Sequence, residues 1–348
     1  MKEMTGREIV KRCIEFRDPP RIGMHFEVFP VDGQIWHETD FASDGYGPDL
    51  NFVPVQPGAD EWGVVRVTLD TSGQGVGEAK VFPLGDGWAR LETYHFPNYA
   101  DPARYAGLVE RVAAQHARGK YVYGDIPGLM ALPADLRGTE NWLTDHLLER
   151  ENLCRLLDRI IEMRLTMIDW YARAGMDAVI SYDDMGTNER VLIRPQLFHD
   201  IYLPRYQQTT AALHKHGMHF LHHCCGMVRE YMDLFIEGGC DVIQLDQPEL
   251  MGIEWLSEHY GEKICFWNAV DIQKTMPTGD LQAIEAEAHR QVWYLGNFGG
   301  GFMVKAYQQP MSVGFSLAAC EAQYRAFHKY GKYPILPFER DNLVVIHR

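Results

Sequence analysis

The chain has 348 residues, of which 46% are apolar and 23% are charged, and its formal net charge is −15. This composition is typical of a folded globular protein and excludes a disordered chain. The acidic balance argues against nucleic acid as a partner, because binding phosphates requires a basic surface. No apolar run approaches the roughly 20 residues of a membrane span, and residues 1–6 lack the apolar core of a signal peptide. The sequence therefore predicts a cytoplasmic protein without a membrane partner.

The seven cysteines are an odd number, and two of them, Cys224 and Cys225, are adjacent. Such a set does not resemble the disulfide framework of a secreted protein. In a reducing compartment these side chains serve as buried apolar groups, metal ligands or nucleophiles.

The first hundred residues predict a helix, a strand and a hairpin. Thr5 and Glu8 have the spacing of a capping box, apolar residues follow at helical spacing, and the prolines at 19 and 20 end the helix. Residues 21–27 then predict the first strand of a barrel. Two further runs, 62–69 and 78–83, flank a glycine-rich turn and predict a β-hairpin.

From about residue 101 onward, predicted helices alternate with short apolar runs that end in polar residues or glycine. The runs are 120–125, 177–184, 218–225, 241–246, 264–268 and 301–305, and the helical stretches are 102–118, 140–174, 192–216, 227–238, 251–260, 278–295 and 312–330. With the opening strand, this pattern approximates a (β/α)8 count, with one strand unidentified. We predict an α/β fold: a single-domain (β/α)8 TIM barrel over residues 1–348, with an N-terminal helix and a β-hairpin insertion. The active site is expected where the strands end.

The most informative stretch is His219–Gly226, in which two histidines and two cysteines crowd the end of a strand. Side chains two positions apart share a face of a strand, so His223 and Cys225 point one way while His222 and Cys224 point the other. Imidazole and thiolate donors suit zinc, and either pair could contribute to a metal site. The spacing does not decide between the two pairs.

A catalytic zinc site needs a third protein ligand and an open position. Asp246 ends the next strand and is the nearest candidate in chain order, although an acid at a strand end can equally be a capping residue. Gln308, Glu249 and Asp271 are weaker candidates at neighbouring strand ends. Asp183 and Asp184 also end a strand, and one of them should face the barrel mouth, where it could act as a base or support a metal ligand.

Several short segments resemble, in order, motifs of a known family. They are Asp60–Gly63 for D-x-W-G, Arg137–Asn141 for R-G-x-E-N, Asp183–Asn188 for D-D-x-G-T-Q, His223–Gly226 for H-x-C-G, and a Gly-Gly-Phe segment ending at Phe302. Together they resemble the uroporphyrinogen decarboxylase superfamily, and within it the zinc-containing methyltransferases of corrinoid systems. Each motif is weak alone, and their order makes the match specific.

The resemblance implies a (β/α)8 barrel in which His223 and Cys225 bind zinc, with Asp246 as an acidic third ligand. This sequence departs from the family at one place. Relatives that activate the thiol of coenzyme M carry a further cysteine ligand after the Gly-Gly-Phe segment, whereas residues 305–310 here contain none. A zinc ion with fewer thiolate ligands is a harder Lewis acid, better suited to polarising an oxygen.

The resulting hypothesis is a zinc-dependent O-demethylase component. Zinc would polarise the ether oxygen of a methoxylated aromatic substrate, and the cob(I)amide of a separate corrinoid-binding protein would accept the methyl group. We expect Asp183 and Asp184 as catalytic residues and His25 and Glu27 as substrate-binding residues. The corrinoid is assigned to a partner because this chain lacks the D-x-H-x-x-G signature.

Three alternatives remain open at this point. The first is a methyltransferase that acts between a methylcorrinoid and a thiol or pterin. The second is porphyrinogen decarboxylation, against which the first strand offers Met24, His25 and Glu27 in place of an arginine-rich segment. The third is a non-catalytic component that binds zinc or substrate.

Overall fold

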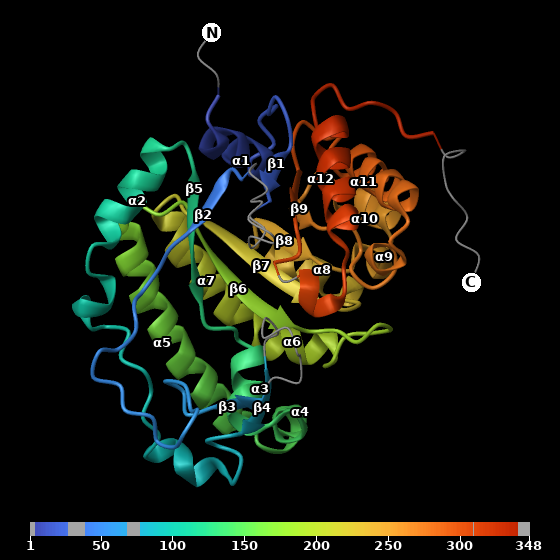
Figure 1. Cartoon of the computed structure of the whole chain (residues 1–348). Coiled ribbons are helices and arrows are strands. Elements are labelled where there is room, and N and C mark those ends of the chain that lie inside the picture. Colours follow the sequence, from blue (N-terminus) through green and yellow to red (C-terminus); the bar gives the residue numbers. More distant parts are fainter. Residues whose placement is uncertain (1–3, 27–38, 68–76, 309, 340–348) are drawn as a thin grey trace.

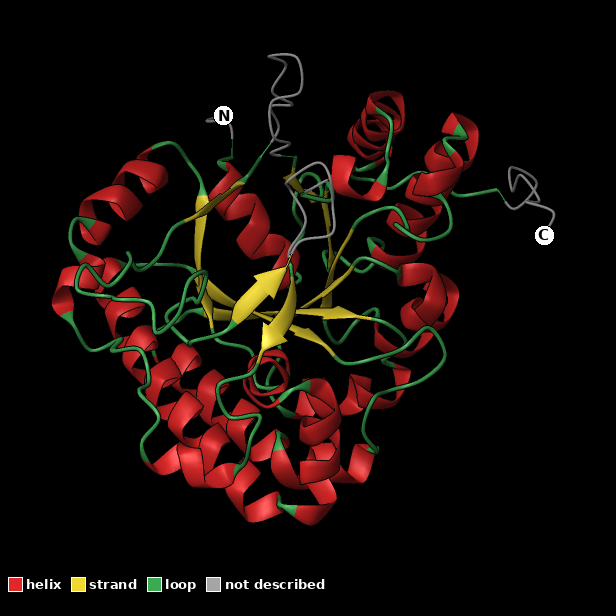
Figure 2. Cartoon of the chain, turned by 60° about the horizontal axis from the view of Figure 1, so that its bottom comes forward, coloured by secondary structure: helices red, strands yellow, loops and turns green. Residues whose placement is uncertain are grey.

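The computed structural model describes residues 4–26, 39–67, 77–308 and 310–339. Within them, eight parallel strands form one sheet in the order β1-β10-β9-β8-β7-β6-β5-β2. They are β1 (Gly23–His25), β2 (Phe41–Ser43), β5 (Tyr121–Ile126), β6 (Ala178–Asp184), β7 (His219–Cys225), β8 (Val242–Leu245), β9 (Cys265–Asn268) and β10 (Phe302–Lys305). Figures 1 and 2 show the sheet curled into a nearly closed barrel with helices around it. The predicted (β/α)8 barrel is confirmed.

The strand that the sequence pattern did not identify is β2. It has only three residues, pairs in register with the start of β5, and places Phe41 opposite Tyr121. A bridge between His25 and Thr39 brings the two edge strands of the sheet together. So short a segment gives no periodic signal of its own, and its pairing defines it as a strand.

The predicted helical ranges are present, and most of them are divided into two pieces. The helices outside the N-terminal segment are η1 (Trp88–Glu92), η2 (Pro102–Tyr105), α2 (Leu108–Ala117), α3 (Ala131–Arg137), α4 (Thr139–Leu148), α5 (Arg150–Ala174), α6 (Pro195–Ile201), α7 (Leu203–Lys215), η3 (Arg229–Tyr231), α8 (Met232–Glu237), α9 (Pro248–Met251), α10 (Ile253–Tyr260), η4 (Met276–Thr278), α11 (Leu281–Leu295), η5 (Pro310–Val313) and α12 (Leu317–Tyr330). A break falls at Gly252, whose φ of 76° is a left-handed conformation that glycine adopts without strain. No helix in the described ranges is long and apolar enough to cross a membrane.

The N-terminal helix α1 (Gly6–Ile14) closes one end of the barrel. Thr5 caps it by accepting a hydrogen bond from the Glu8 amide, as the capping box predicts. Its apolar face packs against inward-facing side chains from the strands, such as Tyr121, Leu221 and Met303. Several of these residues stand at the beginnings of their strands, so α1 covers the amino-terminal end and leaves the carboxyl end as the mouth.

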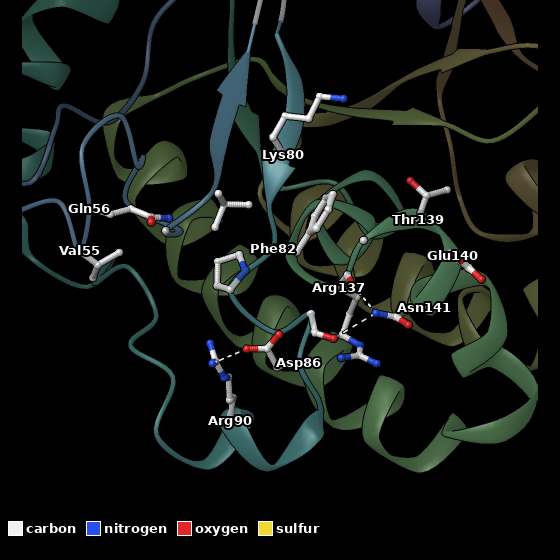
Figure 3. A pocket seen from close by; sticks show the side chains of 15 residues that line it. Val55, Gln56, Lys80, Phe82, Asp86, Arg90, Arg137, Thr139, Glu140 and Asn141 are labelled. Atoms are coloured by element: carbon white, nitrogen blue, oxygen red, sulfur yellow. Dashed lines mark hydrogen bonds and ion pairs between the residues drawn. The ribbon is translucent and has the colours of Figure 1, made fainter.

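The two strands of the predicted hairpin are also confirmed: β3 (Val65–Val67) and β4 (Glu78–Val81) pair antiparallel in a separate two-stranded sheet. Residues 68–76, which include most of the predicted glycine-rich turn, lie outside the described residues. The chain that follows the hairpin is tied to the barrel by two side chains near the α3–α4 junction. The buried Arg137 guanidinium donates to the Leu84 carbonyl and pairs with Asp145 at 2.8 Å. The Asn141 side chain donates to the Gly85 carbonyl at 3.1 Å (Figure 3). Two residues of the R-G-x-E-N segment therefore hold the hairpin region in place.

Candidate metal centre

The centre forms where β6 and β7 end side by side. Their parallel register sets Tyr182 opposite His223 and Asp184 opposite Cys225. Because successive side chains alternate between the faces of a sheet, these four residues point to one side. The other parity buries His222 and Cys224 among the helices outside the barrel. The structure thus places His223 and Cys225 on the face that the family resemblance implied.

Asp184, His223 and Cys225 each offer a ligand atom, and all three atoms lie within 4.8 Å of one another. The Nε2 atom of His223 is 3.4 Å from the Cys225 sulfur and 3.9 Å from an Asp184 oxygen. Around a tetrahedral zinc with its usual bond lengths, a nitrogen and a sulfur ligand stand about 3.6 Å apart. Donor types and spacing therefore fit a zinc ion held by one imidazole, one thiolate and one carboxylate.

A neighbouring side chain, Gln244 of β8, fixes the orientation of the His223 ring. Its Nδ1 atom lies 2.9 Å from the side-chain oxygen of Gln244, which can only accept a hydrogen bond. This contact assigns the proton to Nδ1 and leaves the lone pair of Nε2 directed at Cys225 and Asp184. Burial lowers the pKa of His223, so its neutral form, the form that binds metals, is favoured.

Asp246, the third ligand expected from the sequence, lies outside the cluster of three donor atoms. It is buried, and its carboxylate lies 2.7 Å from the ammonium group of Lys305, at the end of β10. Burial works to raise the pKa of Asp246, but Lys305 and then His223 hold it below its usual range. The structure therefore brings Asp184, rather than Asp246, next to the histidine and cysteine, and a metal-binding role for Asp246 stays a prediction.

The two adjacent acids at the end of β6 have different surroundings. The Asp184 side chain is 73% exposed, whereas Asp183 faces the outer layer and is buried. Asp183 accepts hydrogen bonds from the amides of residues 129–131 at 2.8–3.2 Å, which fixes the loop that leads into α3. A Cβ at Gly128 would lie 2.5 Å from the same carboxylate, so only glycine fits there. A catalytic role for Asp183 stays a prediction, and its contacts favour a positioning role.

His25, predicted to bind substrate, lies inside the barrel at the end of β1. Its ring centroid is 5.2 Å from that of Phe41 and 5.4 Å from that of Trp267, and its register partner is Lys305. Burial, followed by the positive charge of Lys305, lowers the pKa of His25 to about 3, so the ring is neutral. Glu27, the other predicted substrate-binding residue, lies outside the described residues.

Comparison with known proteins shows which family the chain belongs to. The family described as uroporphyrinogen decarboxylase (URO-D) matches residues 94–306, which run from before β5 to just after β10. The chain belongs to the uroporphyrinogen decarboxylase family. The matched part includes Asp184, His223 and Cys225, and the match confirms the resemblance inferred from the ordered motifs.

Several solved structures are similar to this chain at low sequence identity. A methyltransferase from Methanosarcina mazei has a TM-score of 0.68 and 13% identity, with 94% of this chain and 99% of that chain covered. A D-psicose 3-epimerase crystallised with D-fructose has a TM-score of 0.41 and 9% identity over 70% of this chain and 85% of that one. The IOLI protein with a zinc atom has a TM-score of 0.36 and 13% identity over 64% and 92%. Among curated protein sequences, none matches this one.

Two of the family motifs lie beside cavities near the hairpin, apart from the metal centre. A cavity of about 880 Å³ is lined by residues 137–141 and by side chains such as Lys80, Phe82 and Arg90 (Figure 3). A second cavity of about 590 Å³ includes residues 60–63 among its walls and shares Arg90 with the first. Neither cavity is lined by the three clustered donors. The D-x-W-G and R-G-x-E-N segments thus shape the hairpin region of this family member.

The sequence reasoning missed four side chains around the centre. Two of them are Gln244 and Lys305. The other two are Tyr182, whose ring lies 5.5 Å from that of His223, and Tyr307, which interacts electrostatically with Asp246, Cys225 and Asp184. Strand alternation gave a signal for Gln244, because it stands two positions before Asp246 in the run 241–246. Lys305 gave another, as the one cation in the apolar run 301–305.

Proposed function

We propose that this protein is a zinc-dependent methyltransferase that moves a methyl group from a methoxylated, aromatic substrate to the cob(I)amide of a separate corrinoid-binding protein. The observation that carries the proposal is the convergence of Asp184, His223 and Cys225 within 4.8 Å at the carboxyl end of a barrel of this family. The fold shared with a methyltransferase from Methanosarcina mazei is consistent with it.

In this proposal His223, Cys225 and Asp184 hold the zinc ion. Bound zinc supplies a Lewis acid beside the ether oxygen of the substrate, where negative charge develops on the leaving phenolate. A set of one nitrogen, one sulfur and one oxygen donor is harder than a set with two thiolates, which favours an oxygen substrate over a thiol. Gln244 keeps the ligating nitrogen of His223 free of a proton.

Other residues of the chain shape the surroundings of the reacting atoms. The Tyr182 ring packs beside His223 with 40% of the residue exposed, and it offers an apolar wall at the mouth. Burial, and then the charge of Asp246, raises the pKa of Tyr307, so its hydroxyl stays protonated and can donate a hydrogen bond. Asp183 holds the loop before α3 and thereby one side of the mouth.

The test is a spectrophotometric assay of corrinoid methylation. Purified protein of measured zinc content is incubated with cob(I)alamin and a panel of methoxylated aromatics, and conversion to methylcobalamin is followed by absorbance. We expect methylation that is lost on removal of zinc by a chelator and regained when zinc is added back. Demethylation that persists after complete zinc removal would contradict the proposal.

Adjacent cysteines provide a matched pair of variants for the same assay. Cys225→Ala removes a proposed ligand, whereas Cys224→Ala shortens a neighbouring side chain that packs outside the barrel. We expect loss of zinc and of methyl transfer only in Cys225→Ala. Zinc binding without methyl transfer to any corrinoid acceptor would favour the non-catalytic alternative, and methylation of a thiol by methylcobalamin would favour the thiol alternative.

A further inference from the structure

A buried lysine stands between two polar side chains behind the metal centre. Lys305 is 6% exposed, and its ammonium group lies 2.7 Å from a carboxylate oxygen of Asp246 and 3.1 Å from the side-chain oxygen of Gln244. The same Gln244 oxygen receives the Nδ1 proton of His223. Lys305 thus touches both a residue that positions a ligand and an acid beside the centre.

Asp246 is close enough to the centre to act on it. Leu245 pairs with Cys224, which places Asp246 beside Cys225 at the strand ends. The charge of Asp246 interacts with two members of the cluster, His223 and Cys225, and with the Tyr307 hydroxyl. It is also 3% exposed, so little water reaches its carboxylate. A buried carboxylate that lacks a cation for a partner is strongly drawn to a metal ion. Lys305 is the cation that the structure pairs with it.

We propose that Lys305 excludes Asp246 from the metal ion and so keeps the centre at three protein ligands with one open position. This inference rests on the proposed zinc function. Zinc sites closed by four protein ligands are structural, whereas catalytic sites keep a position for substrate. With Asp246 held in the ion pair, the zinc has two anionic ligands, Cys225 and Asp184. The net charge of the ion and its protein ligands is then zero. A third anionic ligand would make the centre negative and a weaker Lewis acid.

Lys305 has a second effect through Gln244. By donating to the Gln244 oxygen, the ammonium group keeps that oxygen, rather than the amide nitrogen, turned toward the interior where His223 also donates to it. An amide turned the other way would present a donor to Nδ1, favour the opposite tautomer and put the proton on the ligating nitrogen. Lys305 therefore keeps one coordination position of the metal open, and it also keeps the ligating nitrogen of His223 free of a proton.

The experiment uses cobalt in place of zinc, because the visible absorption of Co²⁺ reports its coordination number and its bond to a thiolate. Full-length wild type, Lys305→Met, Asp246→Asn and the double variant are loaded with Co²⁺ and titrated with imidazole as a probe of the open position. Lys329→Met, a surface lysine paired with Glu285, is the control for loss of a positive charge. Circular dichroism verifies that each variant is folded.

We expect imidazole to change the spectrum of the wild type, of Asp246→Asn and of Lys329→Met. In Lys305→Met the released Asp246 should occupy the position, so imidazole should have no effect and a chelator should remove Co²⁺ at least about tenfold more slowly. The double variant should regain the response to imidazole.

An unchanged imidazole response in folded Lys305→Met would overturn the inference while leaving the proposed function intact. If Lys305→Met does not fold, Asp246→Asn decides alone: a Co²⁺ spectrum altered without imidazole would mean that Asp246 is already a ligand, and an unaltered spectrum supports its exclusion. Failure of the wild type to bind Co²⁺ or Zn²⁺ would overturn the proposed function and this inference together.

Discussion

At the scale of single residues, two neighbouring aspartates at the end of β6 have different surroundings and different roles. Asp183 is buried among backbone amides, and Asp184 faces His223 and Cys225 of β7. The alternation of a strand requires this difference. It also shows why the sequence could locate the pair without assigning the members: which parity faces the mouth depends on how β6 pairs with β7.

Replacing each acid by its amide should separate metal binding from stability. Asp184→Asn should weaken zinc binding at least about tenfold, because a neutral amide is a poor zinc ligand. Asp183→Asn should leave zinc affinity nearly unchanged and lower the free energy of unfolding by about 1–3 kcal/mol, because buried donors lose a charged acceptor. Competition with a chromogenic chelator and urea unfolding measure the two effects. Equal losses of zinc affinity in both variants would contradict the assignment.

A second buried acid should make stability depend on pH. Glu287 of α11 accepts hydrogen bonds from the Asp271 amide and the Gln291 side chain. Burial, and then repulsion by Glu249 and Asp271, raises the pKa of Glu287 to about 8. The carboxyl therefore stays protonated in the folded protein at a pH where the unfolded chain has lost that proton.

The sign of the effect follows from that difference. An acid with a raised pKa contributes stability that is present at low pH and is lost as the pH rises to the folded value. Between about pH 5 and pH 8 the wild type should therefore lose stability relative to Glu287→Gln, by a few kcal/mol at most. Urea unfolding at several pH values measures this, with the exposed Glu258→Gln as control. A parallel pH dependence in wild type and Glu287→Gln would show that Glu287 is ionised in the fold.

At the scale of elements, the sequence predicted most strands because their apolar runs are continuous, as in buried parallel strands. It could not predict β2, which exists through its pairing with β5. The sequence also merged α4 with α5 and α6 with α7, since helical periodicity continues across the short breaks. Lys305 appeared only as a departure from the family pattern, because its partners Gln244, in β8, and Asp246, just after β8, lie about sixty residues away in the chain.

Shortening a buried side chain of helix α1 should destabilise the barrel. Ile9 is buried in the cluster that α1 forms with the inward-facing strand residues. Ile9→Ala should lower the free energy of unfolding by about 2–5 kcal/mol, and Ile9→Val by about 0.5–1.5 kcal/mol, because the cost grows with the cavity left behind. Urea unfolding of both variants measures the series. Equal and negligible effects would mean that α1 does not seal the barrel.

At the scale of the whole molecule, the order of weak motifs and the alternation of strands and helices sufficed to predict the barrel and its family. The prediction of a single domain over residues 1–348 can be tested by calorimetry. We expect one thermal transition whose calorimetric and van't Hoff enthalpies agree, because closing the barrel joins the first and last strands through β1 and β10. Two separable transitions would contradict it.

The position of α1 limits the routes by which ligands can enter the barrel. In the described residues, one end is filled by α1 and by an aromatic layer that includes Phe41 and Trp267, whose rings stack at 4.7 Å. Under the proposed function, the methyl donor and the corrinoid-bearing acceptor must therefore both reach the site through the mouth of the barrel. The donor has to enter first and settle beneath the acceptor, so saturating the enzyme with acceptor should slow the entry of donor, and steady-state kinetics should show an ordered sequence.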